Sequence, residues 1–406
     1  MNERYPLPQG WRWVKLGEVC EKPVYGYTAS AEHKEVGPKF LRITDIQNGK
    51  VDWDRVPYCR DNEGLEKYLL KSGDVLFART GATTGKSFLI TETPQKTIFA
   101  SYLIRVRTGN NLMSEFLYQF LQSDFYWQQV ESNKRGGAQP NMNATLLSHI
   151  DLPLPPLPGQ KRIVAKIQEL MQEIERARSA CEKQLEAAGA LPAVYLRQIF
   201  ESEEAEKWER KTLGEVISFI KNGIVAEQNF DGKGFQVTRI ETISNGVLDS
   251  GKIGWVNLPL GNFTNFKLFK GDILFSHINS VERLGNCAIY EGIPENLYHG
   301  MNLLRIKADE NILNPYFLLY WLRSNPCKDY YITNARRAIG QASLNQKDMR
   351  QIPIRLPTLS IQQSICSELK EKMAHVEKLQ STIQNQQSAL EALPHSILTK
   401  AFKGEL

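Results

Sequence analysis

The sequence has few cysteines, no long hydrophobic run and no apolar segment at its start. Its six cysteines spread from Cys20 to Cys366 without a Cys-x-x-Cys pair, so neither a disulfide framework nor a zinc site is expected. No stretch approaches the roughly eighteen consecutive apolar residues of a membrane helix, and the first six residues, Met-Asn-Glu-Arg-Tyr-Pro, carry no apolar signal core. We therefore predict a protein without a membrane span in a reducing cytoplasm.

Motifs of catalysis are missing as well. The six histidines stand apart, with no His-Glu-x-x-His pattern, no serine elbow and no carboxylate cluster of the nuclease type. Residues 80–87 read Thr-Gly-Ala-Thr-Thr-Gly-Lys-Ser, but a phosphate-binding P-loop needs glycine at the position of Thr80. Asn314-Pro-Tyr-Phe317 lacks one proline of the amino-methyltransferase motif and is interpreted as a helix start. We therefore predict no catalytic residue, no metal site and no cofactor bound by this chain.

The charge balance is only weakly positive. Lys and Arg number 50 and Asp and Glu 45, so the net charge is +5, which suits a nucleic-acid partner but is equally typical of a mildly basic globular protein. With 406 residues, 42% of them hydrophobic and 23% charged, the chain can form two or three domains that each bury a core.

The chain contains the same pattern twice, about two hundred residues apart. Trp11-Arg-Trp-Val-Lys-Leu-Gly-Glu-Val19 returns as Trp208-Glu-Arg-Lys-Thr-Leu-Gly-Glu-Val216, and Lys71-Ser-Gly-Asp-Val-Leu-Phe77 returns as Phe269-Lys-Gly-Asp-Ile-Leu-Phe275. The offset is 197 residues at Leu16 and 202 from Gln139 onward, so insertions lie only in the first part of each repeat. A repeat of this length indicates duplicated domains of one fold.

Each repeat divides into a variable globular part and a long helix of fixed length. Runs rich in β-formers, such as residues 39–46 and 75–79, precede an apolar helix predicted over residues 114–132 and, in the second copy, 315–333. The proline-rich residues 152–158 indicate an extended exit that ends at a helix start. We predict an α+β (mixed α/β) fold, in which two globular domains, 1–155 and 207–357, are separated by two long-helix regions, 156–206 and 358–406.

Four-three spacing of apolar residues predicts a coiled-coil seam in both long helices. The first seam consists of Ile163, Ile167, Leu170, Ile174, Ala177, Cys181, Gln184, Ala188 and Leu191. The second, 202 residues later, consists of Ile365, Leu369, Lys372, Val376, Leu379, Ile383, Gln386, Leu390 and Leu393. Full antiparallel overlap would place Gln184 opposite Lys372 and Leu170 opposite Gln386. The alternative is that each helix docks only on its own globular domain.

Basic and amide side chains gather in loops at matching places of the two copies. Arg and Lys supply phosphate contacts, whereas Gln and Asn form bidentate hydrogen bonds with base edges. The predicted DNA-contacting residues are Arg79, Thr80, Lys86, Lys134, Arg135, Gln139 and Asn141 in the first copy and His277, Asn279, Arg283, Arg336, Arg337, Gln341 and Asn345 in the second. Because Gln139 and Asn143 recur as Gln341 and Asn345 in copies expected to read different sequences, some of these side chains are expected to fix the loop instead.

In this order, and twice, the motifs resemble the specificity subunit of type I restriction-modification systems. The resemblance covers essentially the whole chain and rests on Trp11 to Gly17, Lys71 to Phe77, Leu152 to Leu157 with Gln160 to Ile163, and the tail from Ser396 to Leu406. It implies an inert chain with two target-recognition domains that each read half of a split site in double-stranded DNA. It also implies paired helices that act as a ruler and bind two methyltransferase subunits, with motor-nuclease subunits joining. S-adenosylmethionine, ATP and magnesium would belong to those partners.

Two other functions stay open at this stage. A methyltransferase or nuclease in its own right would need a cofactor loop or a carboxylate cluster, and neither motif is in the sequence. A protein-binding coiled-coil adaptor without a DNA role would keep the seams but show no salt-sensitive DNA binding.

Overall fold

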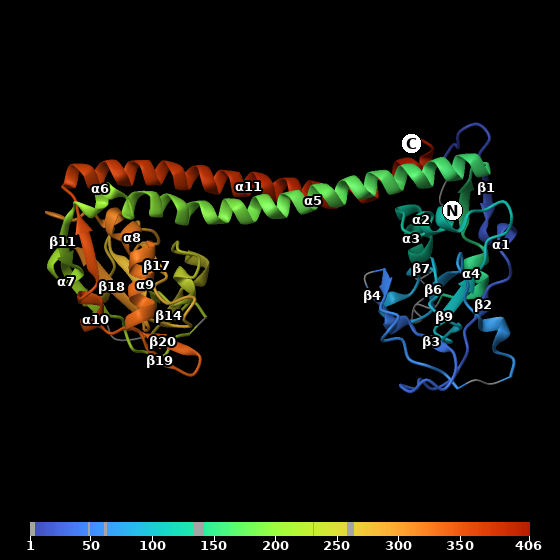
Figure 1. The fold of residues 1–406 in the computed structure, drawn as a ribbon, viewed down its shortest axis with the longest axis horizontal. Helices are drawn as coiled ribbons and strands as arrows, with labels where there is room; N and C mark the ends of the chain where they lie inside the picture. Colours follow the sequence, from blue (N-terminus) through green and yellow to red (C-terminus); the bar gives the residue numbers. More distant parts are fainter. Residues whose placement is uncertain (1–4, 48, 61–62, 133–141, 230, 258–263) are drawn as a thin grey trace. The chain divides into compact units, whose positions relative to one another are not determined.

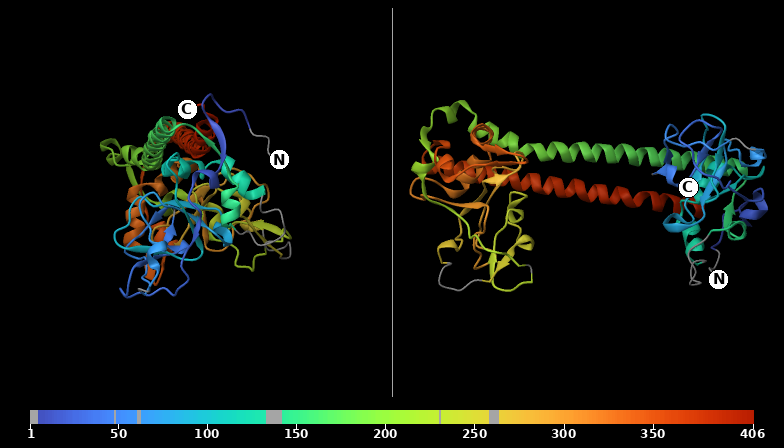
Figure 2. Two further views of the ribbon diagram at one scale, coloured as in Figure 1. Left: turned by 90° about the vertical axis from the view of Figure 1, so that its right-hand side faces the viewer. Right: turned by 90° about the horizontal axis from the view of Figure 1, so that it is seen from below.

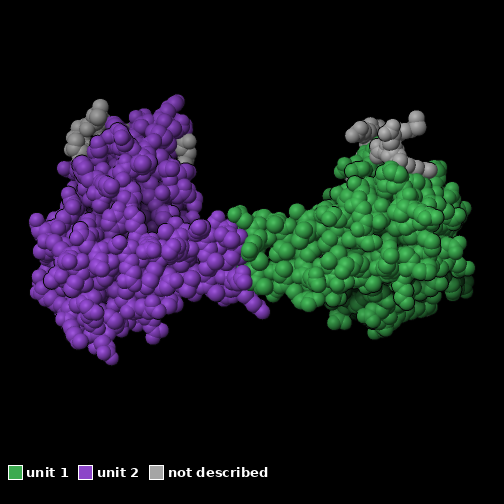
Figure 3. Space-filling view, turned by 90° about the horizontal axis from the view of Figure 1, so that it is seen from above, with its two compact units in different colours: residues 1–182, 385–406 green, residues 183–384 purple. Residues whose placement is uncertain are grey.

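Two long helices, α5 (Leu157–Phe200) and α11 (Leu359–Lys403), each begin in one compact unit of the chain and end in the other (Figures 1 and 3). The computed structural model describes residues 5–47, 49–60, 63–132, 142–229, 231–257 and 264–406. Unit 1 comprises residues 1–182 and 385–406, and unit 2 comprises residues 183–384. Each unit therefore combines a globular part with portions of both long helices, whereas the sequence-based boundaries separated helices from globular domains.

The globular part of unit 1 is built around a four-stranded antiparallel sheet in the order β2-β9-β6-β7. A separate two-stranded sheet, β1 with β10, joins the beginning and the end of this part. Its elements are β1 (Arg12–Lys15), α1 (Leu16–Val19), β2 (Val24–Tyr25), β3 (Lys39–Leu41), η1 (Ile43–Asp45), β4 (Ile46–Gln47), β5 (Lys50–Val51), η2 (Leu65–Tyr68), β6 (Val75–Ala78), η3 (Gly81–Thr83), β7 (Ser87–Leu89), β8 (Thr97–Phe99), β9 (Leu103–Val106), α2 (Ser114–Phe120), α3 (Asp124–Ser132), α4 (Ala144–Ser148) and β10 (Asp151–Leu154).

Unit 2 repeats this plan with the sheet β12-β18-β15-β17 and the pair β11 with β21. The predicted duplication of one mixed fold is thus confirmed. Its elements are α6 (Glu203–Glu206), β11 (Glu209–Thr212), α7 (Leu213–Val216), β12 (Ile217–Asn222), β13 (Phe235–Val237), η4 (Glu241–Ile243), η5 (Ser250–Lys252), β14 (Gly254–Val256), η7 (Thr264–Phe266), β15 (Ile273–Ser276), β16 (Ile278–Asn279), β17 (Cys287–Ile289), β18 (Leu303–Ala308), α8 (Pro315–Arg323), α9 (Asn325–Asn334), β19 (Arg336–Ala338), β20 (Gln341–Ser343), α10 (Gln346–Arg350) and β21 (Pro353–Leu356).

The repeated Gly-Asp motif before β6 and β15 forms a turn that is tied to the sheet by a buried carboxylate. Asp74 accepts a hydrogen bond from the backbone N–H of Lys71 at 3.0 Å and pairs with Arg107 Nε at 2.7 Å. Asp272 accepts one from Phe269 N at 2.7 Å and pairs with Arg305 Nε at 2.8 Å. The preceding glycines have φ of +89° and +93°, in the left-handed region that favours glycine. The motif is therefore structural.

The apolar helix predicted in each copy is interrupted in the structure. Residues 114–132 contain α2 and α3, residues 315–333 fall in α8 and α9, and a serine directly precedes the second helix of each pair. Ser123 Oγ donates to Phe120 O at 2.6 Å, and Ser324 Oγ donates to Trp321 O at 2.6 Å. Pro326 lacks the N–H that would bond the carbonyl of Leu322, and the hydroxyl of Tyr331 donates to that carbonyl at 2.9 Å instead.

The C-terminal ends of the two long helices complete the cores of the units. In unit 1 the ring of Phe402 packs edge-on against Phe116 and Phe120, with centroids 5.4 and 5.3 Å apart. In unit 2 Phe200 does the same with Phe317 and Trp321, at 5.5 and 5.2 Å. Each long helix therefore ends as part of the hydrophobic core of a globular part.

A buried glutamine fixes the start of each long helix. Gln160 Oε1 accepts from Met113 N at 2.8 Å, and its Nε2 donates to Asn111 O at 2.8 Å and Pro155 O at 2.9 Å. Gln362 makes the same three hydrogen bonds, with Asn314 N, Ile312 O and Pro357 O. The glutamine thus uses both ends of its amide to join the helix to the loop before α2 or α8.

Burial along the long helices follows a period of 3.6 residues and departs from the predicted 3.5-residue seam. The buried or half-buried line of α5 runs through Ile163, Ile167, Met171, Ile174, Arg178, Cys181, Leu185, Ala188, Pro192, Leu196 and Ile199, so that ten steps cover 36 residues. The line of α11 runs through Ile365, Leu369, Met373, Val376, Gln380, Ile383, Gln387, Leu390, Pro394, Leu398 and Ala401. A straight helix drifts about 20° per heptad from a 3.5-residue pattern, so the predicted seam turns outward.

The seam prediction was therefore wrong at several positions. Gln184, Leu379, Gln386 and Leu393 are exposed, whereas the other fourteen predicted seam positions are buried or half-buried. The expected layer of Gln184 against Lys372 does not form, because Lys372 Nζ lies 5.0 Å from the ring centroid of Tyr195 and 2.7 Å from Glu368 Oε1.

The two helices are antiparallel within unit 2. Lys372 contacts Tyr195, and a Cβ built on Gly189 would lie 4.0 Å from Gln380 Nε2, so residue numbers rise along one helix as they fall along the other. The views agree that α5 and α11 lie side by side there (Figures 1 and 2). In unit 1, Leu398 and Ala401 of α11 share a core with Ile163 and Ile167 of α5. Among the described helices, none has the length and apolarity needed to span a bilayer.

Candidate nucleic-acid interface

Three segments of unit 1 meet beside the loop that follows β6. The backbone N–H of Ala144, at the start of α4, donates to the hydroxyl of Tyr25 at the end of β2, at 3.0 Å. The guanidinium carbon of Arg79 lies 5.1 Å from the ring centroid of Tyr25. Backbone hydrogen bonds of Arg79 with Tyr102 and Met142, at 3.0 and 2.8 Å, fix the loop. Because Tyr102 is 62% exposed and Arg79 is half-buried, a cation and an aromatic face lie at the surface together.

The same three segments meet in unit 2 with different side chains. Asn222 ends β12, and its Oδ1 accepts a hydrogen bond from Gln346 Nε2, at the start of α10, at 3.0 Å. His277 follows β15, and its carbonyl accepts from Leu344 N at 2.9 Å, as that of Arg79 does from Met142 N. One scaffold therefore presents Tyr25 and Arg79 in unit 1 but Asn222 and His277 in unit 2. Variable side chains on a constant scaffold are typical of a recognition surface.

A β-hairpin extends this surface in unit 2. β19 pairs with β20, which also pairs with β16, and the turn contains Gly340 with φ of +74°. Arg336, Arg337 and Gln341 are exposed on the hairpin, and Arg337 Nη2 donates to Ile332 O at 3.1 Å. Arg336 also borders a pocket of about 420 Å³ that is lined by Asn222, His277, Ile278, Ser343, Leu344, Asn345, Gln346 and Lys347. The hairpin therefore brings cations beside amide side chains.

The structure describes three of the seven predicted residues of unit 1 and places these three in one loop. Arg79 and Thr80 are half-buried and Lys86 is exposed, on either side of η3. Lys134, Arg135, Gln139 and Asn141 lie outside the described residues. In unit 2, Arg283 is exposed in the loop between β16 and β17. DNA contact stays a prediction for these residues.

Three predicted contacts of unit 2 also have structural roles. His277 is only 6% exposed, and burial lowers its pKa to about 4, so its imidazole is neutral. Asn345 Oδ1 accepts from Asp348 N at 2.9 Å as the N-cap of α10. Asn279 donates to Ser276 Oγ at 3.0 Å and accepts from Ser280 N at 2.9 Å. DNA contact stays a prediction for these three residues, of which His277 is largely buried and Asn279 and Asn345 already use their amide oxygens as acceptors.

Sequence reasoning missed Tyr25, Tyr102, Asn222 and Lys347. A usable signal existed for Tyr25 and Asn222, which stand at equivalent positions 197 residues apart, each directly before a glycine. A Cβ on Gly26 or Gly223 would clash with a neighbouring backbone carbonyl, so both glycines are required by close packing. Because the glycine keeps the backbone the same in both units, the residue before it differs between the units only in its side chain.

We expect unit 2 to lose stability in acid through a second buried histidine, His299. It takes the place of Phe99 of unit 1, since its carbonyl accepts from Ile224 N as that of Phe99 does from Tyr27 N. Burial lowers the pKa of His299 to about 4, below the 6.5 of an unperturbed imidazole. A lowered folded-state pKa gives stability that is complete above pH 6.5 and is lost as the pH falls toward 4.

The expected loss is about 3 kcal/mol for this histidine, from roughly 1.4 kcal/mol per pKa unit. Unfolding of the full chain followed by urea titration at several pH values measures it. The variant His299→Phe, which copies unit 1, should show a flatter pH profile. An identical slope in both proteins between pH 6.5 and 4 would contradict the assignment.

Both units match the family model for the type I restriction modification DNA specificity domain, over residues 8–183 and 205–386. The chain belongs to this family. It is 23% identical over 420 residues to the type I restriction enzyme EcoKI specificity subunit of Escherichia coli (strain K12), covering 98% of this chain and 90% of that one. The putative MjaX specificity subunit of Methanocaldococcus jannaschii is 40% identical over 198 residues, which cover 48% of this chain and 46% of that relative's length.

Solved structures of the family share the fold. A chain from a study of complex assembly and conformational transition of the type I R-M system aligns with a TM-score of 0.73 and 25% identity, over 99% of this chain and 100% of its own. The HsdS subunit from Thermoanaerobacter tengcongensis aligns with a TM-score of 0.69 and 24% identity, over 100% and 99%. Membership in the family assigns the chain to DNA sequence recognition in a restriction-modification system.

Proposed function

We propose that this chain is the non-catalytic, DNA-reading and scaffolding subunit of a type I restriction-modification complex. Each unit reads one half of a bipartite site in double-stranded DNA through the loop after β6 or β15 and the neighbouring segments. The observation that carries the proposal is a repeated scaffold with different side chains at its surface, Tyr25 and Arg79 in unit 1 and Asn222 and Arg336 in unit 2. Two readers with one backbone and different side chains suit a split target whose halves differ in sequence.

The long helices are proposed to set the spacer between the half-sites and to dock two methyltransferase subunits. Val194, Leu379 and Leu393 are 44%, 44% and 42% exposed on them and are available for contact with another protein. Motor-nuclease subunits complete the assembly in this proposal. S-adenosylmethionine, ATP and magnesium act in those partners, and the complex works in the cytoplasm.

Salt-dependent DNA binding tests the reading role. Replacing Arg336 and Arg337 by alanine should weaken binding and reduce the slope of log K against log salt concentration by about one for each phosphate that is no longer neutralised. The matched control is Arg210→Ala, because Arg210 is also exposed but lies on β11, away from the hairpin (Figure 1). Equal slopes for the double variant and the wild type would exclude the hairpin from the interface.

Assays of the purified wild-type chain distinguish the proposed function from the two other candidates, a methyltransferase and an adaptor. A methyltransferase would transfer methyl groups from S-adenosylmethionine to DNA as the pure chain, whereas the proposed subunit should do so only with its partners. An adaptor without a DNA role would show no salt-sensitive DNA binding, alone or with a methyltransferase partner.

A further inference from the structure

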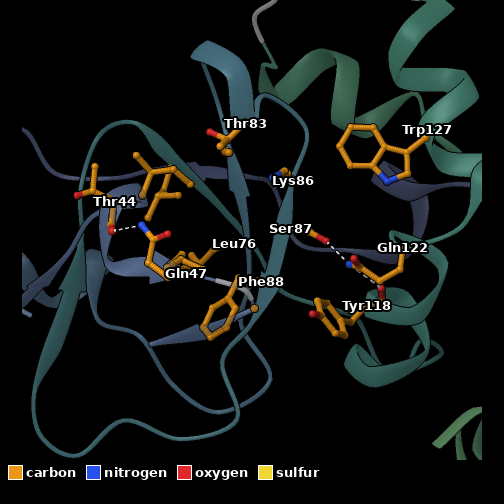
Figure 4. A pocket seen from close by; sticks show the side chains of 15 residues that line it. Thr44, Gln47, Leu76, Thr83, Lys86, Ser87, Phe88, Tyr118, Gln122 and Trp127 are labelled. Atoms are coloured by element: carbon orange, nitrogen blue, oxygen red, sulfur yellow. Dashed lines mark hydrogen bonds between the residues drawn. The ribbon is translucent and has the colours of Figure 1, made fainter. Parts of the chain in front are cut away.

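Unit 1 contains a pocket, and among the described residues of unit 2 an arginine side chain crosses the matching region. The pocket encloses about 540 Å³ between the 80–86 loop, the strands β6 and β7, and the helices α2 and α3 (Figure 4). Thr83 and Lys86 of that loop line the pocket, so it opens beside residues predicted to contact DNA. This volume lies within the range of small-ligand sites, about 300–1,000 Å³.

The pocket combines aromatic side chains with amide oxygens that accept no hydrogen bond from the described residues. Phe88, Tyr118 and Trp127 line it. Gln122 Nε2 donates to Ser87 Oγ at 2.9 Å and to Tyr118 O at 3.4 Å, which leaves Gln122 Oε1 as an acceptor. Gln47 Nε2 donates to Thr44 O at 2.8 Å, and Gln47 Oε1 likewise remains as an acceptor among the described residues.

Unit 2 carries a larger side chain at the position of Gln122. Arg323 precedes Ser324 as Gln122 precedes Ser123, and both serines make the same hydrogen bond back to the helix before them. Arg323 Nη2 donates to Cys287 O at 2.8 Å and to Gly246 O. Cys287 begins β17 as Ser87 begins β7, and Gly246 stands 197 residues after the pocket residue Gly49. An arginine therefore spans the region that is hollow in unit 1.

We propose that this pocket binds a single nucleobase with an exocyclic amino group, adenine or cytosine, held outside the DNA stack. The amino group donates to the amide oxygen of Gln122, and the ring packs against the aromatic side chains. Lys86 at the opening contacts the adjoining phosphate. Unit 1 thus reads one base in a pocket, whereas Arg323 occupies the matching region of unit 2. The inference rests on the proposed function, and the same ring could also come from a free nucleoside.

Two arms of one experiment distinguish these sources. In the first, the full chain without partner subunits binds duplexes in which each position of both half-sites is mispaired in turn. A mispair lowers the cost of extruding a base, so affinity should rise about tenfold or more at one position of the half-site read by unit 1, and at none in the other. In the second, adenosine and cytidine are titrated into the chain without DNA.

Variants at position 122 make the result specific. Gln122→Arg copies unit 2 and should abolish the gain from the mispair while DNA binding persists. Gln122→Met leaves the space but removes the acceptor, and should weaken nucleoside binding about tenfold because one hydrogen bond is removed. Met serves as the second variant if the arginine does not fold.

Each outcome decides the matter. Nucleoside binding without a mispair effect supports the pocket chemistry and assigns it to a free ligand. A chain that binds no DNA, either alone or with its methyltransferase partner, contradicts the proposed function, and the nucleoside arm alone then decides the pocket. The absence of both effects, or effects unchanged in Gln122→Arg, overturns the inference.

Discussion

Exchanging residues 207–357 for the same segment of a relative is expected to replace one half of the recognised DNA sequence and to leave the other half unchanged. The segment is closed on itself, because β11 and β21 pair from Glu209 with Leu356 to Thr212 with Pro353. The segment contains Asn222, the hairpin β19–β20 and the loop after β15, which together form the candidate DNA-reading surface of unit 2. Each mismatched base pair typically costs about 1–3 kcal/mol, so three altered positions would shift the preference by about a hundredfold or more.

Mapping of methylated bases in cells that carry the exchanged chain and its partner subunits measures both halves. The design must keep Phe317 and Trp321, because these two rings pack on Phe200 of α5, outside the segment. A matched control transplants the segment but retains the residues 336–343 of the original chain. Changes in both half-sites after the plain exchange would show that the two units do not read independently.

Adding seven residues to each long helix is expected to lengthen the preferred spacer by about three base pairs while both half-site sequences stay the same. Insertion after Glu182 and after Gln384 places the new residues at the boundary between the units in both helices. Seven residues add roughly 10 Å at 1.5 Å per residue, and duplex DNA rises about 3.4 Å per base pair. The insertion turns the buried line by only about 20°, which a helix pair tolerates.

Selection from a DNA library with randomised spacer lengths gives the preferred spacer directly. Affinity should fall with the longer spacer unless the duplex twists, because three base pairs also rotate one half-site about the axis. An insertion of five residues is the control, since it rotates the buried line by about 140° and should abolish helix pairing. A seven-residue variant that still selects the original spacer would remove the helices as the element that sets distance.

Local pattern and repetition predicted much of the architecture. The 202-residue recurrence of the tail and the glycine-aspartate turns indicated two copies of one fold, and the structure contains the same sheet order twice. The single helix predicted after the sheet was wrong in both copies, because a serine hydroxyl satisfies the last carbonyls and lets the chain bend. The spacing of apolar residues does not show where a serine hydroxyl bonds a backbone carbonyl and interrupts the helix.

The coiled-coil seam shows the same limit. Ile163, Ile167, Ile365 and Leu369 are buried as the heptad pattern predicts, since little drift accumulates over one turn. Further along, Leu185 is half-buried where Gln184 was expected. Periods of 3.5 and 3.6 residues both place apolar residues at alternating intervals of four and three. Only packing against the neighbouring helix therefore selects between these two periods.

The sequence by itself determined that the chain is duplicated, that each copy has a variable part and a part of constant length, and which family it belongs to. Those properties follow from order and spacing along the chain. The tertiary structure alone decided that Tyr25, Arg79 and Ala144 meet, that His277 is buried while Arg336 is not, and that Arg323 spans the place where unit 1 has a pocket. These depend on contacts between residues far apart in sequence, and a side chain's exposure is set by the neighbours that those contacts bring to it.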